Sequence, residues 1–331
     1  MTHDQNETAT QPRILSIGEA LFDELEGGER HLGGAPLNLA LHAAQLGAEA
    51  ALWSAVGRDE LGEELLAALS SRGVSAELVT QHRARETGRV MVRLDAETGE
   101  ASYQIKEGVA WDELEWPEQL PARLAELDAL CFGSLCLRGA HNLSTLKALW
   151  LQLERRVERK ERAPLCFFDM NLRPPFVDWP CIEECLEAAD ALKVNREEWS
   201  ALCQRALRGA VDSEDREGRA LSEAQLERAQ ARAMMARFNL RWLVITKGAE
   251  GLTLHHREGV EQAREPALEP EQLKAGDSVG AGDATSAALL VSLLNGASWA
   301  ESAQFAARCG AFVVSQRGAT PAFPEELRRG P

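Results

Sequence analysis

The sequence is poor in positive charge and in aromatic residues, and it has no long apolar run. It has 36 lysines and arginines but 52 acidic residues. The resulting net charge of −16 argues against a nucleic acid or an anionic membrane as partner. No apolar stretch reaches the ~18 residues of a membrane-spanning helix. Residues 1–12 lack the basic-then-apolar order of a signal peptide, so we expect a disordered tail on a cytoplasmic protein.

Disulfide bonds and zinc sites are not expected either. The seven cysteines are odd in number and lie mostly in apolar runs, which is typical of reduced thiols in a core. Cys181 and Cys185 are spaced to share one helix face, but no second pair and no nearby histidine completes a zinc site. With 45% hydrophobic residues, the chain can instead build a large apolar core.

Short apolar segments alternate with helical ones along most of the chain. Strands are expected at residues 14–18, 51–56, 129–133, 165–169, 191–194 and 242–246, with helices between them. Strands joined by helices of this size predict a doubly wound α/β fold, with a mostly parallel sheet covered by helices on both faces. We find no repeat and no linker, so residues 13–331 are expected to form one domain, with a surface insertion at 207–220.

A predicted hairpin interrupts this alternation. Thr87 to Leu94 and Ala101 to Lys106 both carry alternating apolar residues, and a turn-like segment at 95–99 separates them. We expect the hairpin to stand off the main sheet as a small second layer or lid.

The stretch from Asp277 to Asp283 points to phosphate chemistry. Three small residues, Gly280, Ala281 and Gly282, precede an acid and an apolar helix ending near Gly296. Amides at such a helix N-terminus bind anions, and a carboxylate placed there fits a general base for phosphoryl transfer. Two other interpretations remain: ordinary helix capping by the acid, and a dinucleotide loop, which lacks its third glycine.

Other polar residues follow predicted strands or begin helices. Gly33 and Gly34 open a helix in which Asn38 offers a donor and an acceptor to a polyol, although a plain glycine-rich turn would look the same. Asp169, Asn195 and Thr246 stand at strand carboxyl ends, where open α/β sheets bind ligands.

Several motifs together resemble the ribokinase-like (pfkB) carbohydrate kinase family, and within it the bacterial fructokinases. The stretch Asp277–Asp283 is similar to the C-terminal family signature, with Ser278 where threonine is more usual. The other similar stretches are Gly33–Asn38, Gly57–Gly62, Val109–Asp112, Asp169–Arg173 and Gly318–Pro321. The similarity runs in order over roughly residues 13–325.

The resemblance implies a role for each matching residue, and a β lid formed by about residues 19–33 and 86–110. Asp283 matches the catalytic base, and the Gly280, Ala281 and Gly282 amides match its anion hole. The sugar-binding positions are Asp23, Gly34, Asn38, Asn171 and Arg173; the nucleotide positions are Asn195, Glu198, Thr246 and Gly248; the metal positions are Glu198 and Asp277. The chain departs from the family pattern at Ala307–Cys309, where many members carry an asparagine near adenine.

The activity implied is ATP- and Mg²⁺-dependent phosphorylation of a free sugar, most simply the 6-hydroxyl of D-fructose, with K⁺ as a further ion at Asp277. Other acceptors remain open, namely 2-keto-3-deoxygluconate, ribose or a nucleoside, as does a sugar-sensing protein without turnover. A homodimer joined through the lid is the expected assembly. No Gly-x-x-x-x-Gly-Lys-Ser/Thr loop is present, so the helix terminus must hold the phosphate.

Overall fold

The computed structural model describes residues 11–25, 27–94, 101–209, 211, 220–264 and 278–331. Most of the predicted tail and most of the predicted 207–220 insertion lie outside these ranges, as does Asp277. No helix in the described ranges is both long and apolar enough to cross a membrane.

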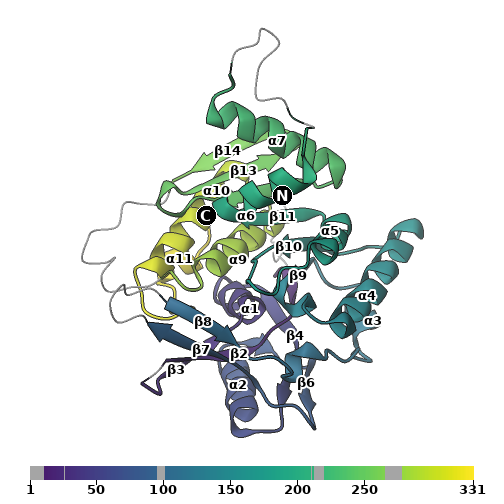
Figure 1. Ribbon diagram of the computed structural model, residues 1–331, viewed down its shortest axis with the longest axis vertical. Helices are drawn as coiled ribbons and strands as arrows, with labels where there is room; N and C mark the ends of the chain where they lie inside the picture. The colour runs from purple at the N-terminus through teal and green to yellow at the C-terminus, as the bar shows by residue number, and fades with distance from the viewer. Residues whose placement is uncertain (1–10, 26, 95–100, 210, 212–219, 265–277) are drawn as a thin grey trace, which may run out of the picture.

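A ten-stranded, mostly parallel sheet forms the centre of the molecule (Figure 1). Its main path runs β14-β13-β12-β11-β10-β9-β1-β4-β5, and β6 pairs with β4. The strands are β1 (Arg13–Ile17), β4 (Glu49–Gly57), β5 (Val74–Ser75), β6 (Val79–His82), β9 (Ala129–Gly133), β10 (Leu165–Asp169), β11 (Ala191–Asn195), β12 (Trp242–Thr246), β13 (Leu252–His256) and β14 (Gly259–Ala263). All six predicted strands are present; β5, β6, β13 and β14 were not predicted, and β13 and β14 are antiparallel.

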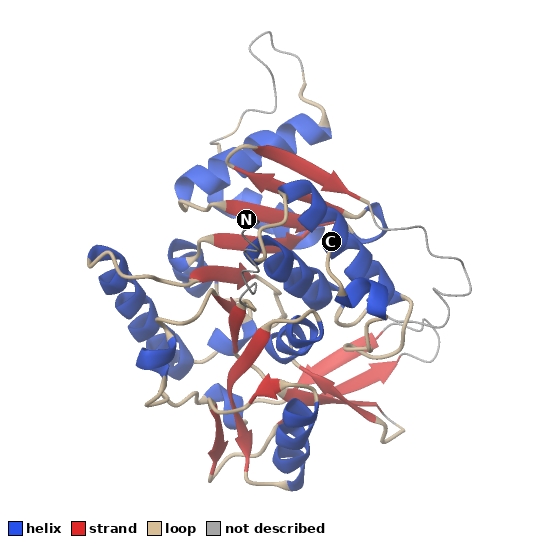
Figure 2. Cartoon of the chain, turned by 180° about the vertical axis from the view of Figure 1, so that it is seen from behind, coloured by secondary structure: helices blue, strands red, loops and turns tan. Residues whose placement is uncertain are grey.

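Helices cover both faces of this sheet (Figure 2), which confirms the predicted fold class. They are α1 (Ala35–Gln45), α2 (Glu60–Ser71), α3 (Leu120–Arg123), α4 (Ala140–Glu158), α5 (Trp179–Ala188), α6 (Arg196–Ala206), α7 (Glu223–Arg237), α9 (Ala281–Leu294), α10 (Trp299–Val314) and α11 (Glu325–Arg328). Side chains of α1, α2, α9 and α10 share one apolar cluster, whereas those of α4 to α7 share another. Neighbouring residues of β10 face opposite clusters, Phe167 the first and Phe168 the second.

Helix α9 is the central helix of the first cluster. Residues 284–292 are all buried, as expected for a helix that is apolar on every side. It packs against both α10 and α1. Gly296, with φ 84°, follows its last turn in the left-handed conformation that the sequence predicted.

A second, four-stranded sheet stands apart from the main one, with order β3-β2-β7-β8. Its strands are β2 (Leu21–Leu25), β3 (Arg30–Gly33), β7 (Gly88–Leu94) and β8 (Ala101–Ile105). β7 and β8 pair antiparallel, which confirms the predicted hairpin, and β2 adds to β7 in parallel. Only Leu21, Val90 and Val92 form its buried cluster among the described side chains.

Candidate active site

The N-terminus of α9 is fixed from behind by the loop near the end of the chain. Gly280 caps the helix with φ 79°, and a Cβ there would lie 2.1 Å from the carbonyl oxygen of Ala319. The same oxygen lies 3.0 Å from Nε2 of His42, a buried residue of α1. Gly280 is therefore required both by its positive φ and by close packing, and not only by access for a ligand.

The first turn of α9 lies beside a lysine, Lys193, that the sequence analysis did not identify. Lys193 projects from β11, and a Cβ at Gly282 would lie 2.8 Å from its Nζ atom. Among the described residues, no acceptor is paired with the amides of Gly282 and Asp283. Free amides and an ammonium group thus face the same point, which is an arrangement suited to an anion.

Lys193 belongs to a buried network that joins β10, β11 and α9. Its Nζ donates to both carboxylate oxygens of Asp169, at 3.0 and 3.1 Å, and Ser286 donates to Oδ2 of Asp169 at 2.8 Å. Burial alone would lower the pKa of Lys193, but the carboxylates of Asp169, Glu198 and Asp283 raise it above its ordinary value. The lysine therefore stays charged at neutral pH.

Asp283 lies in the first turn of α9, and its Oδ2 accepts a hydrogen bond from Nδ2 of Asn38 at 2.8 Å. Part of the residue is accessible to solvent, yet its dense protein surroundings raise the pKa of the carboxyl to about 6, with a further contribution from Asp169. Lys193, Asn38 and Arg173 act in the opposite direction. A carboxyl group that titrates near neutral pH can accept a proton during a reaction.

Two further acids lie near Asp283, and one of them, Glu19, was also missed. Glu19 follows β1 and is buried; the amide of Ala35 at the start of α1 lies close enough to lower the pKa of its carboxyl, while its Oε2 has no hydrogen-bond partner. Burial raises the pKa of Glu19 to about 7 and that of Asp23 to about 6. The position of Glu19 beyond the carboxyl end of a parallel strand could have revealed it.

Arg173 is the cation on the open side of these acids. Its positive charge lowers the pKa values of Glu19, Asp23 and Asp283. The residue is exposed, and within the described residues its side chain makes one hydrogen bond, a 3.5 Å contact from Nη1 to the carbonyl oxygen of Leu172. One free guanidinium and three carboxyl groups thus surround the space beside Asn38.

The remaining sugar positions lie on the loops around this space. Gly34 caps α1 with φ 103°, and a Cβ there would lie 2.4 Å from the carbonyl oxygen of Glu19. A Cβ at Gly33 would lie 2.3 Å from Oδ2 of Asp23. Asn171 has a positive φ of 42° in the loop that leads to Arg173. The two glycines therefore let the acids approach the start of α1 closely.

The predicted nucleotide positions form a neighbouring group at the ends of β11 and β12. Asn195 and Thr246 are paired across these strands, and Gly248 follows in a short 3₁₀ helix with φ 58°. Asn195 and Glu198 form a capping box at the start of α6. Glu198 also accepts from the amide of Leu172 at 2.7 Å, so it joins the Arg173 loop to α6.

Glu198 is the described side chain that could hold a magnesium ion beside the nucleotide positions. Both carboxylate oxygens of Glu198 accept backbone N–H groups, from Leu172 and Asn195, and retain further lone pairs. Within the described ranges, no group of three or more histidine, cysteine or acidic side chains could hold a metal. This donor set fits Mg²⁺ that keeps its waters and takes other ligands from phosphate oxygens, as Mg²⁺ commonly does.

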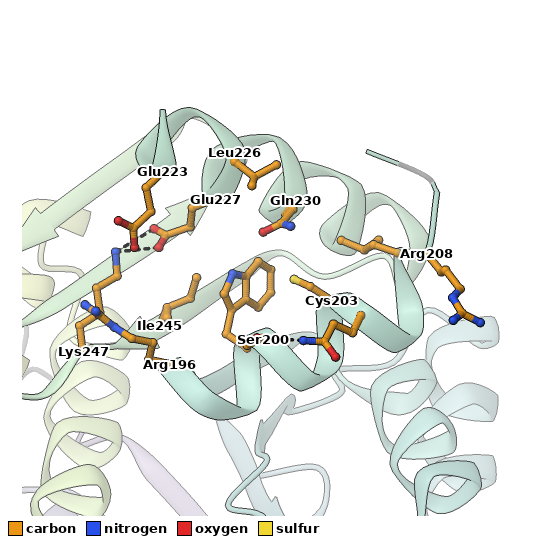
Figure 3. Close-up of a pocket in the computed structure, with 13 residues that line it drawn as sticks. Arg196, Ser200, Cys203, Arg208, Glu223, Leu226, Glu227, Gln230, Ile245 and Lys247 are labelled. Carbon is orange, nitrogen blue, oxygen red and sulfur yellow. Dashed lines mark hydrogen bonds and ion pairs between the residues drawn. The ribbon is translucent and has the colours of Figure 1, made fainter. Parts of the chain in front are cut away.

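A large cavity of the described structure lies away from these residues. It has a volume of about 710 Å³ and lies between α6 and α7 (Figure 3), and Trp199 is among the residues that line it. None of the predicted site residues lines it. Lys247, which does line it, points toward Glu227, to which it is bonded at 2.7 Å (Figure 3).

Curated proteins of similar sequence are fructokinases. The chain is 27% identical over 338 residues to "Probable fructokinase-4" of Arabidopsis thaliana, covering 95% of this chain and 94% of that one. It is 28% identical over 330 residues to "Fructokinase" of Escherichia coli, covering 94% and 96% of the two chains.

Solved structures give the same result for the fold. An uncharacterized sugar kinase of Pyrococcus horikoshii superposes with a TM-score of 0.70 at 25% identity, over 96% of this chain and 99% of that chain. A fructokinase of Xylella fastidiosa with bound ATP gives 0.75 at 21% identity, over 95% and 96%. The model of the pfkB family carbohydrate kinases matches residues 15–326. The chain therefore belongs to the pfkB family of carbohydrate kinases, which are sugar phosphotransferases.

Proposed function

We propose that the protein transfers the γ-phosphate of ATP to the 6-hydroxyl of D-fructose. The observation that carries this proposal is Asp283, a carboxyl group with a pKa of about 6 in the first turn of α9, beside free backbone amides. The choice of fructose rests on the curated relatives, which are named fructokinases. The use of ATP is supported by the structural relatives with bound ATP.

In this reaction, Asp283 accepts the proton of the sugar hydroxyl. The hydroxyl oxygen then forms a bond to the γ-phosphorus, while the bond from that phosphorus to the oxygen of the departing ADP breaks. Asn38 donates to Oδ2 of Asp283, which leaves Oδ1 for the sugar. The amides of Gly280 and Gly282 with Lys193 stabilise the charge that develops on the transferred group, and the predicted third amide, that of Ala281, donates to the carbonyl oxygen of Ser278 at 3.4 Å.

The acceptor sugar is held by the acids and Arg173. Asp23 and Asn38 exchange hydrogen bonds with its other hydroxyls, the Gly34 backbone allows close approach, and Asn171 and Arg173 close the opposite side. Because a buried polar group without a partner costs about 1–3 kcal/mol, a sugar that lacks one of these hydroxyls binds about 5- to 150-fold more weakly.

The nucleotide lies along the ends of β11 and β12, against Asn195, Thr246 and Gly248. Mg²⁺, when bound, offsets the negative charge of the phosphates. Glu198 holds this ion through its waters. Asp277, outside the described residues, is the position at which K⁺ would bind.

The small sheet covers the sugar as a lid. Exclusion of water prevents the site from hydrolysing ATP, so closure should accompany sugar binding. A small sheet alone is marginally stable in water, and a homodimer joined through the lid strands would cover it further. Sedimentation velocity decides the assembly, because a monomer at micromolar concentration would exclude this dimer.

A coupled ADP-release assay over a panel of acceptors tests the proposed substrate. We expect fructose to give a higher kcat/KM than 2-keto-3-deoxygluconate, ribose or nucleosides. A higher value for another acceptor would replace fructose and leave the kinase assignment intact, whereas no turnover with any acceptor would favour a sugar-sensing protein. Asp283→Asn should lower kcat by about 10²–10⁴ while ATP still binds. Near-normal turnover in this variant would exclude Asp283 as the base.

A further inference from the structure

A second charged cavity lies at the edge of the main sheet, on elements that the proposed reaction does not use. Its volume is about 580 Å³, and it lies between α7 and the turn that joins β13 to β14. The lining residues are Arg228, Arg232, Met235, His255, His256, Arg257, Glu258, Gly259 and Val260. His256 pairs with Trp242 at the amino end of β12, so this cavity lies at the sheet edge opposite the carboxyl ends that carry the candidate active site.

Three arginines of this cavity have no charged partner. Arg228 and Arg232 are one turn apart on α7, which places them side by side on one helix face, and Arg257 belongs to the opposing turn. All three are exposed, and none has an ion pair or hydrogen bond from its side chain within the described residues. Glu258 is the single acid in the lining. In a chain of net charge −16, this is a local excess of positive charge.

The two histidines of β13 point to opposite faces of the sheet, and His255 is the one that faces α7. His256 stacks on Trp299 of α10, with the ring centroids 4.6 Å apart, and an oxygen of Glu261 lies 3.5 Å from its Nε2. His255 is bonded to Glu227 at 3.3 Å. Among the described residues, the unpaired donors of this cavity are therefore the three arginine side chains, and His255 is the neighbouring group that links them to Glu227.

We propose that this cavity is a binding site for a small oxyanion, a phosphate or carboxylate group of a metabolite. Arg228 and Arg232 are its principal ligands, and Arg257 closes it from the turn. Guanidinium groups bind such oxyanions through two parallel hydrogen bonds, and adjacent arginines can hold one anion from two sides. The volume is within the range of small-molecule sites.

The site has a physical connection to the nucleotide positions. His255 is bonded to Glu227, and Glu227 is bonded to Lys247, which lies between Thr246 and Gly248. Burial alone would raise the pKa of Glu227, but the hydrogen bonds from His255 and Lys247 lower it to about 2. Glu227 is thus charged at neutral pH, and an anion near His255 competes with it for the same donor. We therefore expect occupancy of the site to change the KM for ATP.

Isothermal titration with citrate and, separately, with inorganic phosphate tests the site. The protein is saturated with fructose and a non-hydrolysable ATP analogue, without free Mg²⁺, so that the proposed active site is filled. We expect the double variant Arg228→Gln/Arg232→Gln to weaken binding by about tenfold or more, since both paired ligands are lost. The matched control is Arg155→Gln/Arg159→Gln, which removes two exposed arginines of the same spacing from the end of α4. The two anions separate a carboxylate ligand from a phosphate ligand.

Equal affinity in the two double variants, or no binding by the wild-type protein, would overturn the site. Concentration-dependent association that is lost in Arg228→Gln/Arg232→Gln would overturn it too, because the arginines would then meet another copy of this acidic chain. Binding by the wild-type protein with an unchanged KM for ATP would overturn the coupling. The titrations measure anion binding and do not need turnover. Failure of the proposed kinase reaction can therefore be distinguished from failure of the proposed anion site.

Discussion

The two sheets of this protein differ in how firmly their residues are held. The main sheet has an apolar cluster on each face, and at its carboxyl edge the buried Lys193 and Asp169 are bonded to each other, and Asp169 also to Ser286 of α9. The small sheet has a cluster of its own with three buried apolar side chains in its described part, Leu21, Val90 and Val92, whereas Phe22 of β2 packs into the main cluster. The proposed reacting groups and the proposed lid thus differ in packing.

This difference matches the two tasks of a sugar kinase. Groups that stabilise a transition state must be held in place before the reaction, which buried and fully bonded residues achieve. A cover that opens for each substrate must have a low cost of local opening, which few buried contacts provide. The following changes test this division, and the largest expected effect comes first.

Replacement of Lys193 should damage the main-sheet site most. Lys193→Met leaves the buried carboxylate of Asp169 without its cation, at a cost of about 3–5 kcal/mol in the free energy of unfolding. The lost charge at Gly282 should also lower kcat by about 10²–10³, since such donors act in a site shielded from water. Urea unfolding and steady-state kinetics measure the two effects.

Lys147→Met, which removes an exposed lysine paired with Glu184, is the control for this change. Lys193→Met with normal stability and a normal kcat would show that the network is dispensable. A stability loss with a normal kcat would assign Lys193 to folding alone.

Replacement of Glu19 should have a smaller effect that depends on pH. Its pKa rises from 4.5 to about 7 on folding, so the folded protein keeps a proton that the unfolded chain has released. The stability that this group contributes is complete below pH 4.5 and is lost as the pH rises through about 7. Glu19→Gln stays uncharged and keeps an acceptor for the amide of Ala35. We expect its unfolding free energy, relative to wild type, to increase by about 3 kcal/mol between pH 4.5 and pH 8.

Chemical unfolding at a series of pH values measures this difference. Glu107→Gln, an exposed residue of the small-sheet region, should show no such trend. A constant difference between Glu19→Gln and wild type over the whole pH range would contradict the buried acid described here.

The smallest effect compares equal truncations in the two sheets. Val90 in β7 is 5% exposed and Val244 in β12 is 0% exposed. Each valine-to-alanine change removes about 1–2 kcal/mol of burial. In Val244→Ala this loss should appear in global unfolding. In Val90→Ala it should appear as faster hydrogen exchange of β7 and β8 and a higher KM for the sugar.

Saturating fructose should slow exchange in β7 and β8 of the wild-type protein, because sugar binding closes the lid. If fructose leaves that exchange unchanged, the small sheet is not a lid. If both variants lose the same global stability and neither changes local exchange, the two sheets are equally firm.

Much of the fold could be read from the chain because it depends on local patterns. Short apolar strands alternating with helices predicted six strands of the main sheet, and the predicted helix end at Gly296 has the expected positive φ. β13 and β14 were missed because an antiparallel pair added at a sheet edge leaves no helix between its strands. β5 has two residues and β6 four, too few for a periodic signal.

The candidate site was predictable where its signal is a motif. Asp283 and Asn38 stood out beside glycines at helix starts, and their side chains are bonded to each other across 245 residues of sequence. Lys193 was missed because one lysine in a short strand gives no pattern, although a lysine between apolar residues is rarely buried without a partner. Glu19 was missed because its neighbours at the start of α1 are distant in sequence.

The sequence by itself determined which segments become strands, which helix starts are glycine-rich, and that an acid follows the small residues before α9. These properties depend on residues within about one or two turns of one another. The tertiary structure alone decided which charges meet. Lys193 becomes a partner of Asp169 only because β10 and β11 are neighbours, and it reaches Gly282 only because α9 begins at their carboxyl ends. Electrostatic interactions and burial depend on distance in space, so the pKa values of Glu19, Asp23 and Asp283 are properties of the folded chain and not of its motifs.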